Sequence, residues 1–249
     1  MKAHDSGGAL IAFDIRRYDS IGSTNDEAMR LAHCGAAHGT VVCAAMQTAG
    51  RGRQARHWHS PPGNLYVSIL LRPDRPIVRI PELSFVTALA VADAADTVQP
   101  DGVRAELKWP NDVLVRGAKV AGILIEHTDP ATVVGVGVNI RHAPSDAPYA
   151  VTTLAAAGAG AADPDAVLPV LLAAFRCRFA DWRDCGFAAI RTAWLERAHP
   201  PGAPLRVRIG ERTVQGRFAD LSHDGALVIE MPEGRRRIHA GEVLSPPDR

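Results

Sequence analysis

The sequence predicts an α+β protein of 249 residues with a small β-barrel at its C-terminal end. Helical periodicity alternates with short, β-branched apolar segments over residues 1–199. The prolines of residues 199–204 cannot continue a helix and indicate a linker. Four brief apolar segments with glycine-containing turns follow that linker. We therefore expect two domains, at residues 1–199 and 205–249.

The N-terminal part of the chain predicts strands, one helix and one long loop. Thr24 and Glu27 have the spacing of a capping box, which places a helix from Thr24 to about His33. The expected strands cover residues 13–18, 40–46 and 65–71, and a Gly- and Arg-rich loop covers residues 47–63.

Further elements follow as far as the C-terminus. Pro81 begins a helix whose apolar face runs through Leu83, Val86, Ala90 and Ala94. Asp163 and Pro164 cap a long helix, and another helix covers residues 187–197. The expected strands of the middle region are residues 105–109, 113–116, 120–126 and 132–138, with a hairpin turn at residues 116–118. The expected C-terminal strands are residues 205–209, 213–218, 226–230 and 235–239.

Composition and charge exclude several classes of protein. The 28 Lys and Arg balance 27 Asp and Glu, and this net charge of +1 argues against a protein that coats nucleic acid. No apolar segment is long enough to span a bilayer, and no signal peptide is predicted. The four cysteines lack CxxC spacing, which argues against a zinc site or a disulfide framework. The cytoplasm is the expected location.

Residues 50–58, with the sequence GRGRQARHW, are the most unusual stretch. Two glycines allow a ligand to approach the backbone, and three arginines offer planar donors for phosphate or carboxylate. The glycine spacing superficially matches a dinucleotide fingerprint, but Pro61 and Pro62 follow where that fingerprint needs a helix, so we reject it. A solvated arginine loop and an RNA contact stay open, although the near-zero net charge weakens the second.

Three further segments carry candidate residues, each with a plain structural alternative. Residues 108–112 (KWPND) are a hairpin turn with a packing tryptophan, or they place Asp112 to hold Mg²⁺ or to orient Lys119. Lys119 begins residues 119–126 (KVAGILIE), either as a solvated lysine or as a cation that neutralises a phosphate during displacement. The glycines of residues 135–139 (GVGVN) mark a bulge or the close approach of a ligand.

The order and combination of these motifs resemble the biotin protein ligase family over nearly the whole chain. The matching segments are Ser23-Thr24-Asn25, Gln47, residues 50–58, 108–112, 119–126 and 135–139, and the C-terminal positions Gly210, Gly216, Gly225 and Gly241. The resemblance implies a mixed-sheet catalytic domain related to lipoate ligases and class II tRNA synthetases. It also implies that the C-terminal barrel is SH3-like.

The resemblance implies a two-step reaction that uses ATP and Mg²⁺. The biotin carboxylate would attack the α-phosphate of ATP, giving biotinyl-5′-adenylate and pyrophosphate. A lysine of a biotin carboxyl carrier protein, from acetyl-CoA carboxylase or a related carboxylase, would then attack the mixed anhydride and release AMP. Two anions must meet in the first step, so cations that screen their repulsion are expected.

The resemblance also implies roles for individual residues. Lys119 would be the main electrostatic catalyst, Asp112 would position or deprotonate the acceptor lysine or hold the metal, and Arg51 would be a further catalytic residue. The residues expected to bind biotin are Ser23, Thr24, Asn25, Gln47, Arg51, Gly52, Arg53, Lys119 and Gly122. The residues expected to bind ATP or the adenylate are Arg53, Arg56, Trp58, Asn111 and Asn139. As a partly exposed hairpin lysine, Lys119 should be replaceable by alanine without loss of folding.

Some features depart from the family's pattern, and rival functions stay open. Ala55 replaces a common glycine, and Arg141 follows the last motif where a neutral polar residue is common. The chain begins almost at the catalytic domain, so we expect no DNA-binding role. A lipoate or octanoate ligase is the nearest rival, and an RNA-binding module and an inactive scaffold are others. The arginine loop, KWPND and the barrel favour biotin, Lys119 and Asp112 favour an active enzyme, and both a monomer and a homodimer are open.

Overall fold

A seven-stranded mixed sheet forms the centre of the computed structural model, which describes residues 10–73, 75–160 and 162–244. The strand order is β1-β2-β3-β7-β6-β5-β4; β1 pairs with β2 in parallel and the other neighbours are antiparallel. The strands are β1 (Asp14–Ile21), β2 (Thr40–Gln47), β3 (Leu65–Leu71), β4 (Ala105–Lys108), β5 (Asp112–Val115), β6 (Ala118–Thr128) and β7 (Ala131–Val138). The mixed sheet expected from the family resemblance is therefore confirmed.

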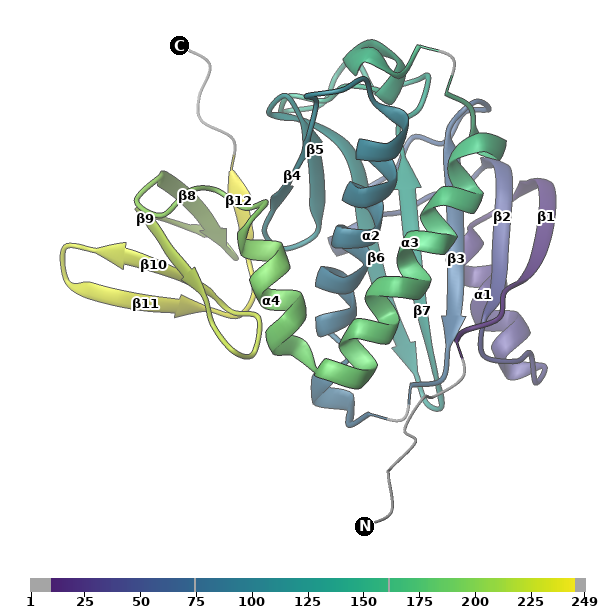
Figure 1. Ribbon diagram of the computed structural model, residues 1–249, viewed down its shortest axis with the longest axis horizontal. Helices are drawn as coiled ribbons and strands as arrows, with labels where there is room; N and C mark the ends of the chain where they lie inside the picture. The colour runs from purple at the N-terminus through teal and green to yellow at the C-terminus, as the bar shows by residue number, and fades with distance from the viewer. Residues whose placement is uncertain (1–9, 74, 161, 245–249) are drawn as a thin grey trace.

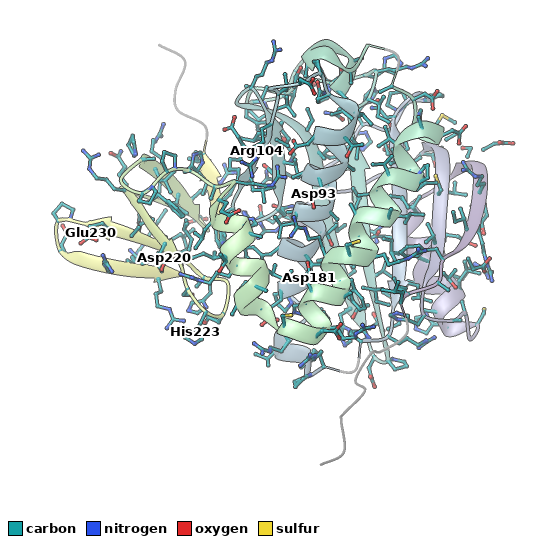
Figure 2. All side chains as sticks on the ribbon, in the orientation of Figure 1. Asp93, Arg104, Asp181, Asp220, His223 and Glu230 are labelled. Carbon is teal, nitrogen blue, oxygen red and sulfur yellow. The ribbon has the colours of Figure 1, made fainter. Side chains whose placement is uncertain are left out.

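Helices cover both faces of this sheet (Figure 1). The helices are α1 (Thr24–His33), α2 (Glu82–Val98), α3 (Pro164–Cys185) and α4 (Phe187–Leu195). In Figure 1, α2 and α3 lie in front of the sheet and α1 lies behind it. Asp93 of α2 (Figure 2) accepts hydrogen bonds from Arg178 at 2.7 Å and Arg197 at 2.8 Å, which ties α2 to α3 and to the end of α4. No helix among the described residues is both long and apolar enough to cross a membrane.

Side-chain alternation along β7 separates the two faces of the sheet. Val134 and Val136 join the large apolar core beneath α2 and α3. Val133 joins a smaller core beneath α1. Gly135 and Gly137, with the same period of two as Val133, carry no side chain on the α1 face. The α1 face is therefore open above these two glycines, and this opening positions the candidate site.

The predicted capping box is wrong in detail. Ser23 is the N-cap of α1 and makes no side-chain capping bond, while Thr24 is already inside the helix. The Thr24 N–H and hydroxyl both donate to the side-chain oxygen of Gln47, at 2.8 and 3.1 Å. A partner from β2 thus replaces the local cap, because the Gln47 amide satisfies the helix-terminal N–H that a capping side chain would otherwise bind.

The C-terminal residues form a separate five-stranded antiparallel sheet instead of the predicted four-stranded barrel. Its strands are β8 (Pro204–Ile209), β9 (Arg212–Leu221), β10 (Leu227–Met231), β11 (Gly234–Ile238) and β12 (Glu242–Leu244), in the order β11-β10-β9-β8-β12. Within the described part of the chain its end strands β11 and β12 do not pair, so the sheet is open. Strand β12 has three residues, too few to give a readable alternation in the sequence.

The small sheet packs directly against the motif KWPND. The buried indole N–H of Trp109 donates to the Gly225 carbonyl at 3.1 Å, and the Phe85 ring lies against Gly225. Arg191 of α4 donates both to Asp220 at 2.6 Å and to the Leu221 carbonyl, and Figure 2 shows Asp220 on the small sheet. Apolar side chains of both parts belong to one continuous core. The C-terminal sheet is therefore held against the turn that carries Asp112.

Candidate active site

A cleft open to solvent lies on the α1 face of the large sheet, beneath residues 51–58 and beside Gly241. All of the predicted site residues except Asn139 line it: Ser23, Thr24, Asn25, Gln47, Arg51, Gly52, Arg53, Arg56, Trp58, Asn111, Asp112, Lys119 and Gly122. Asn139 lines an adjoining cleft together with Arg56, Trp58 and Lys119. Segments that are distant in the sequence therefore meet at one place, which is necessary if they form one ligand-binding site.

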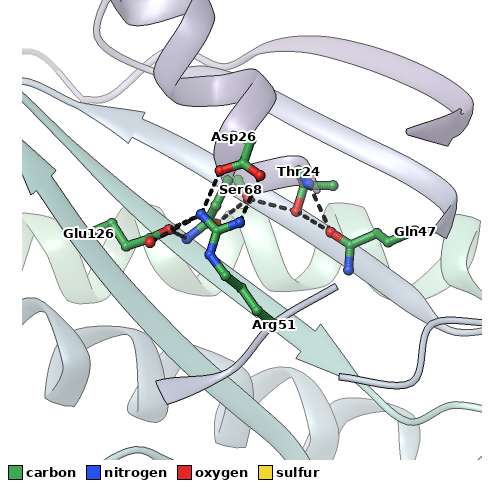
Figure 3. A network of polar contacts seen from close by, with 7 residues as sticks. Thr24, Asp26, Gln47, Arg51, Ser68 and Glu126 are labelled. Carbon is green, nitrogen blue, oxygen red and sulfur yellow. Dashed lines mark hydrogen bonds and ion pairs between the residues drawn. The ribbon is translucent and has the colours of Figure 1, made fainter. Parts of the chain in front are cut away.

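Neutral polar groups gather at one end of the cleft (Figure 3). The hydroxyl of Ser68 lies 2.6 Å from Asn25 Oδ1 and 2.8 Å from Thr24 Oγ1, and Thr24 in turn donates to Gln47. Ser68, Thr24 and Asn25 are buried, so each hydrogen bond fixes the direction of the next group. This end can present a few oriented donors and acceptors to a neutral polar ligand.

Arg51 holds the Gly/Arg loop to this polar end. Its guanidinium donates to both oxygens of Asp26, at 2.6 and 2.7 Å, and to Glu126 at 3.0 Å (Figure 3). Asn25 donates to Glu126 at 2.6 Å, so the network includes helix α1, strand β6 and the loop. Two carboxylates already compensate the charge of Arg51, and the hydrogen bond to Asp26 is the main cause that raises its pKa. The geometry therefore favours a structural tie over the predicted catalytic role of Arg51.

Gly135 and Gly137 provide the space on which this site depends. A Cβ atom at Gly135 would overlap the Asn25 amide, whose Cγ would lie 2.9 Å away. A Cβ atom at Gly137 would overlap the Trp58 ring, whose Cε2 would lie 2.6 Å away. These distances are too short for any side chain, so the glycines permit close approach and do not mark a bulge.

Gly135→Ala is expected to weaken the binding of biotin, the ligand that the family resemblance implies, at least about tenfold, which is about 1.4 kcal/mol. The added methyl group displaces the Asn25 amide and with it the hydrogen bonds to Ser68 and Glu126. Calorimetric titration with biotin measures the change. Gly22→Ala is the matched control, because a Cβ atom at Gly22 meets nothing within 4 Å. Equal affinity in the two variants would contradict the assigned position of Asn25.

The other two loop arginines differ in their charge compensation. Arg56 donates to both oxygens of Glu242 at 2.7 Å, and Arg208 also contacts Glu242. Arg53 donates only to neutral oxygens, those of Asn111 at 3.3 Å and Gly241 at 3.4 Å. No carboxylate of the described residues forms an ion pair with Arg53, and burial lowers its pKa. Arg53 is thus the loop arginine best placed to meet an anionic ligand.

Glu242→Gln is expected to lower the free energy of unfolding by about 1 kcal/mol, a value reduced for solvent screening. The hydrogen bond from Arg56, and then that from Arg208, lower the pKa of Glu242 from 4.5 to about 2. A carboxyl group whose pKa is lower in the folded than in the unfolded chain stabilises the fold at any pH above its unfolded pKa. This stabilisation is lost as the pH falls through the pKa of the folded state. The difference from wild type should therefore be constant from pH 6 to 8 and shrink below about pH 4.5.

Urea unfolding over this pH range measures the effect of Glu242→Gln. Glu230→Gln is the control, because Glu230 (Figure 2) makes a single, more exposed ion pair with Arg235 in the same small sheet. Its loss should cost less than about 0.5 kcal/mol. A Glu242 effect no larger than that of Glu230 would show that the bridge to Arg56 contributes nothing beyond an ordinary surface pair.

Two lysines enclose Asp112 at the end of the cleft that faces away from Thr24 and Gln47. Lys119 Nζ lies 2.6 Å from Asp112 Oδ1, and Lys108 Nζ lies 3.3 Å from Oδ2. All three residues are buried, with Lys119 only 9% exposed. The expectation that Lys119 is a partly exposed hairpin lysine is therefore wrong: the strand following the hairpin turn is enclosed by β5 and by residues 149–152.

Aromatic rings surround the ammonium group of Lys119. It lies 5.4 Å from the centroid of the Trp58 ring and 5.4 Å from that of Tyr149, within the range of cation–π attraction. The indole N–H of Trp58 is buried and has no acceptor among the described residues. Such an unpaired donor beside a cleft can bind a ligand oxygen.

The described residues contain no preformed cluster of metal ligands. No group of three or more His, Cys, Asp or Glu among the described residues could hold a metal ion. Each oxygen of Asp112 already faces a lysine ammonium, so the geometry does not favour Asp112 as a metal ligand.

Sequence reasoning missed several residues of the site. Glu126 could have been found, because it lies four residues after Gly122 on the same face of one strand, where it contacts Asn25 and Arg51 of the site. Tyr149 and Glu242 reach the cleft only through the tertiary fold. Ala55, where the family resemblance implies a glycine, has a φ of 55°, which lies in the left-handed region that favours glycine.

Fold and site define a class of protein: a mixed-sheet protein with a C-terminal antiparallel sheet, whose cleft joins a neutral polar end to a cationic end. In agreement, the model of the Biotin/lipoate A/B protein ligase family matches residues 18–141, and that of the Biotin protein ligase C terminal domain matches residues 202–244.

Individual relatives narrow this class. The chain is 41% identical to a biotin–[acetyl-CoA-carboxylase] ligase of Paracoccus denitrificans, over 89% of this chain and 96% of that protein. It is 34% identical to the bifunctional ligase/repressor BirA of Bacillus subtilis, over 91% and 72%. Its structure resembles the biotin protein ligase of Aquifex aeolicus in complex with biotin and ATP, with a TM-score of 0.82, 29% identity, and 93% and 97% coverage. The chain belongs to the biotin protein ligase family.

Proposed function

We propose that this protein activates biotin with ATP to biotinyl-5′-adenylate and transfers the biotinyl group to a lysine of a biotin carboxyl carrier protein. Biotin ligation with ATP agrees with the names of its relatives and with the biotin and ATP bound in the similar structure. The observation that carries the proposal is the division of the cleft. Its neutral end suits the ureido ring of biotin, and its cationic end suits a carboxylate and phosphates.

In the first step, the residues of the cationic end bring two anions together. Lys119 and Arg53 would face the biotin carboxylate and the α-phosphate, and their charge offsets the repulsion between these groups. The carboxylate oxygen attacks phosphorus, the bond from phosphorus to the bridging oxygen breaks, and pyrophosphate leaves with the electron pair. Thr24, Asn25 and Gln47 would hold the ureido ring meanwhile. Trp58, Arg56, Asn111 and Asn139 would contact the adenylate.

In the second step, Asp112 would act on the acceptor lysine. The acceptor nitrogen attacks the acyl carbon, a C–N bond forms, the C–O bond to the phosphate breaks and AMP leaves. The acceptor must lose its proton. Two carboxylates of the described residues line the cleft: Glu242 is bound by Arg56 and Arg208, and the buried Asp112 lies beside Lys119, so Asp112 is the proposed base. The loop of residues 51–58 would exclude water from the anhydride.

The partner and the setting complete the proposal. The acceptor would be the carrier protein of acetyl-CoA carboxylase or a related carboxylase. The protein would act in the cytoplasm as a monomer or homodimer, with residues 1–199 as its catalytic domain and residues 205–249 as its C-terminal domain.

Incubation of the protein with ATP, Mg²⁺, biotin and a biotin carboxyl carrier domain tests this function. Intact-mass spectrometry should show one biotinyl group per carrier. A carrier whose acceptor lysine is replaced by arginine is the control and should stay unmodified. Absence of the adduct on the unaltered carrier, or an equal adduct on the control, would contradict the proposed transfer.

A further inference from the structure

Lysine is rare in this protein, and two of its few lysines meet at one carboxylate. Of the 28 Lys and Arg residues only three are lysines: Lys2, Lys108 and Lys119. Arginine therefore serves nearly every other cationic position, including the whole Gly/Arg loop. A compact ammonium differs from a guanidinium in size and in its ability to move between partners. Both described lysines lie at Asp112.

The two lysines bind different oxygens of Asp112. Lys119 contacts Oδ1 at 2.6 Å and Lys108 contacts Oδ2 at 3.3 Å, so neither excludes the other. Three adjacent strands create this arrangement: Lys108 of β4 is in register with Asp112 of β5, and Lys119 lies on β6. The Tyr149 ring lies 5.6 Å from Lys108 Nζ and 5.4 Å from Lys119 Nζ. The group carries one net positive charge.

The two lysines differ in their access to ligand. Lys119 and Asp112 line the cleft, whereas Lys108 lines neither this cleft nor the adjoining one. Lys108 is only 7% exposed, and among the described residues its carboxylate partner is Asp112. A ligand in the cleft can therefore reach Lys119 but not Lys108.

We propose that Lys108 is a positioning residue that keeps Asp112 compensated, so that Lys119 can leave Asp112 for the anionic ligand. The inference rests on the proposed function, because the ligand is the biotin carboxylate or the adenylate phosphate. Without Lys108, departure of Lys119 would leave a carboxylate buried and unpaired, which is strongly unfavourable. Lys119 would then stay with Asp112 and its charge would be withheld from the reacting anions.

Lys108→Met, Asp112→Asn and the double variant test this arrangement by biotin-dependent ATP–pyrophosphate exchange. Lys108→Met is expected to lower kcat about 100-fold, the effect of withdrawing one preorganised cation. The KM for biotin should change less than about threefold, because Thr24, Asn25 and Gln47 are untouched. In the Asp112→Asn background, which has no carboxylate to hold Lys119, Lys108→Met should lower kcat less than about threefold. An equal loss in both backgrounds would overturn the proposal.

Two further measurements test the role of Lys108: the kinetics of Lys108→Arg and the urea unfolding of the variants. Lys108→Arg retains the charge in a larger group and should keep kcat at least about tenfold above that of Lys108→Met; a loss as large as that of Lys108→Met would overturn the counter-ion role. Urea unfolding of the four proteins measures the same coupling without catalysis: Lys108→Met should destabilise the wild type but not Asp112→Asn. Equal destabilisation would overturn the inference. Absence of exchange by the wild type would instead contradict the proposed function.

Discussion

Lys119→Met is expected to lower the rate of biotin-dependent ATP–pyrophosphate exchange about 10³-fold, by loss of the cation nearest the reacting anions. Lys119 is the lysine that lines the cleft, and the rings of Trp58 and Tyr149 keep its charge in a partly dehydrated setting. Electrostatic interactions are stronger there than in water. A methionine retains the length and apolar stem of the side chain and removes the charge, so the comparison isolates the electrostatic contribution.

Lys119→Met should also cost about 1–3 kcal/mol of stability, because it removes one of two buried partners of Asp112. Lys108 stays at 3.3 Å and keeps this cost below that of a wholly unpaired carboxylate. Urea unfolding distinguishes lost folding from lost chemistry. Arg104→Met is the control, because it removes one positive charge from an exposed position immediately before β4, the strand that carries Lys108. This variant should leave exchange unchanged. Exchange by Lys119→Met within tenfold of the wild type would remove Lys119 from its role.

Asp112→Asn is expected to lower transfer of biotin to the carrier about 10³-fold, within the range of general base catalysis. Adenylate formation should fall less than about tenfold, because the cations of the cleft remain. Biotinyl-adenylate should therefore accumulate on the enzyme. A single-turnover assay with labelled biotin, read before and after addition of the carrier, separates the two steps.

The contrast between the two steps carries the argument for Asp112. Asparagine preserves the shape of the side chain and can still accept a hydrogen bond, but it cannot hold the proton of the acceptor lysine. Asp181→Asn, on the exposed surface of α3 (Figure 2), is the control and should leave both steps unchanged. An equal loss in adenylation and in transfer would assign Asp112 to the first step and contradict its proposed role.

Most of the fold could be predicted because its signals are local. The strands of the large sheet alternate or are β-branched, and Asp163 caps α3 as expected, accepting a hydrogen bond from the Ala166 N–H at 2.8 Å. The capping box at Thr24 failed because Gln47, from a different strand, took the place of the local cap. Strand β12 was missed because three residues carry no measurable period.

The site could be predicted as a set of residues but not as a charge pattern. The motifs identified which residues gather at the cleft. These residues lie at strand ends or beside glycines of one sheet face, and both features can be read from the sequence. Burial of Lys119, pairing of Arg56 with Glu242 and the tie from Arg51 to Asp26 depend on elements far apart in the sequence. These pairings favour Arg53 and Lys119 over Arg51 as the cations that meet the ligand.

Biotin-dependent ATP–pyrophosphate exchange in the presence of Mg²⁺, run beside lipoate and octanoate, tests the central claim most directly. The neutral polar end formed by Thr24, Asn25, Gln47 and Ser68 has donors and acceptors for a ureido ring, which lipoate and octanoate lack. We expect exchange with biotin and none above background with the other two acids. Exchange with lipoate or octanoate but not with biotin, from protein that is folded, would contradict the account.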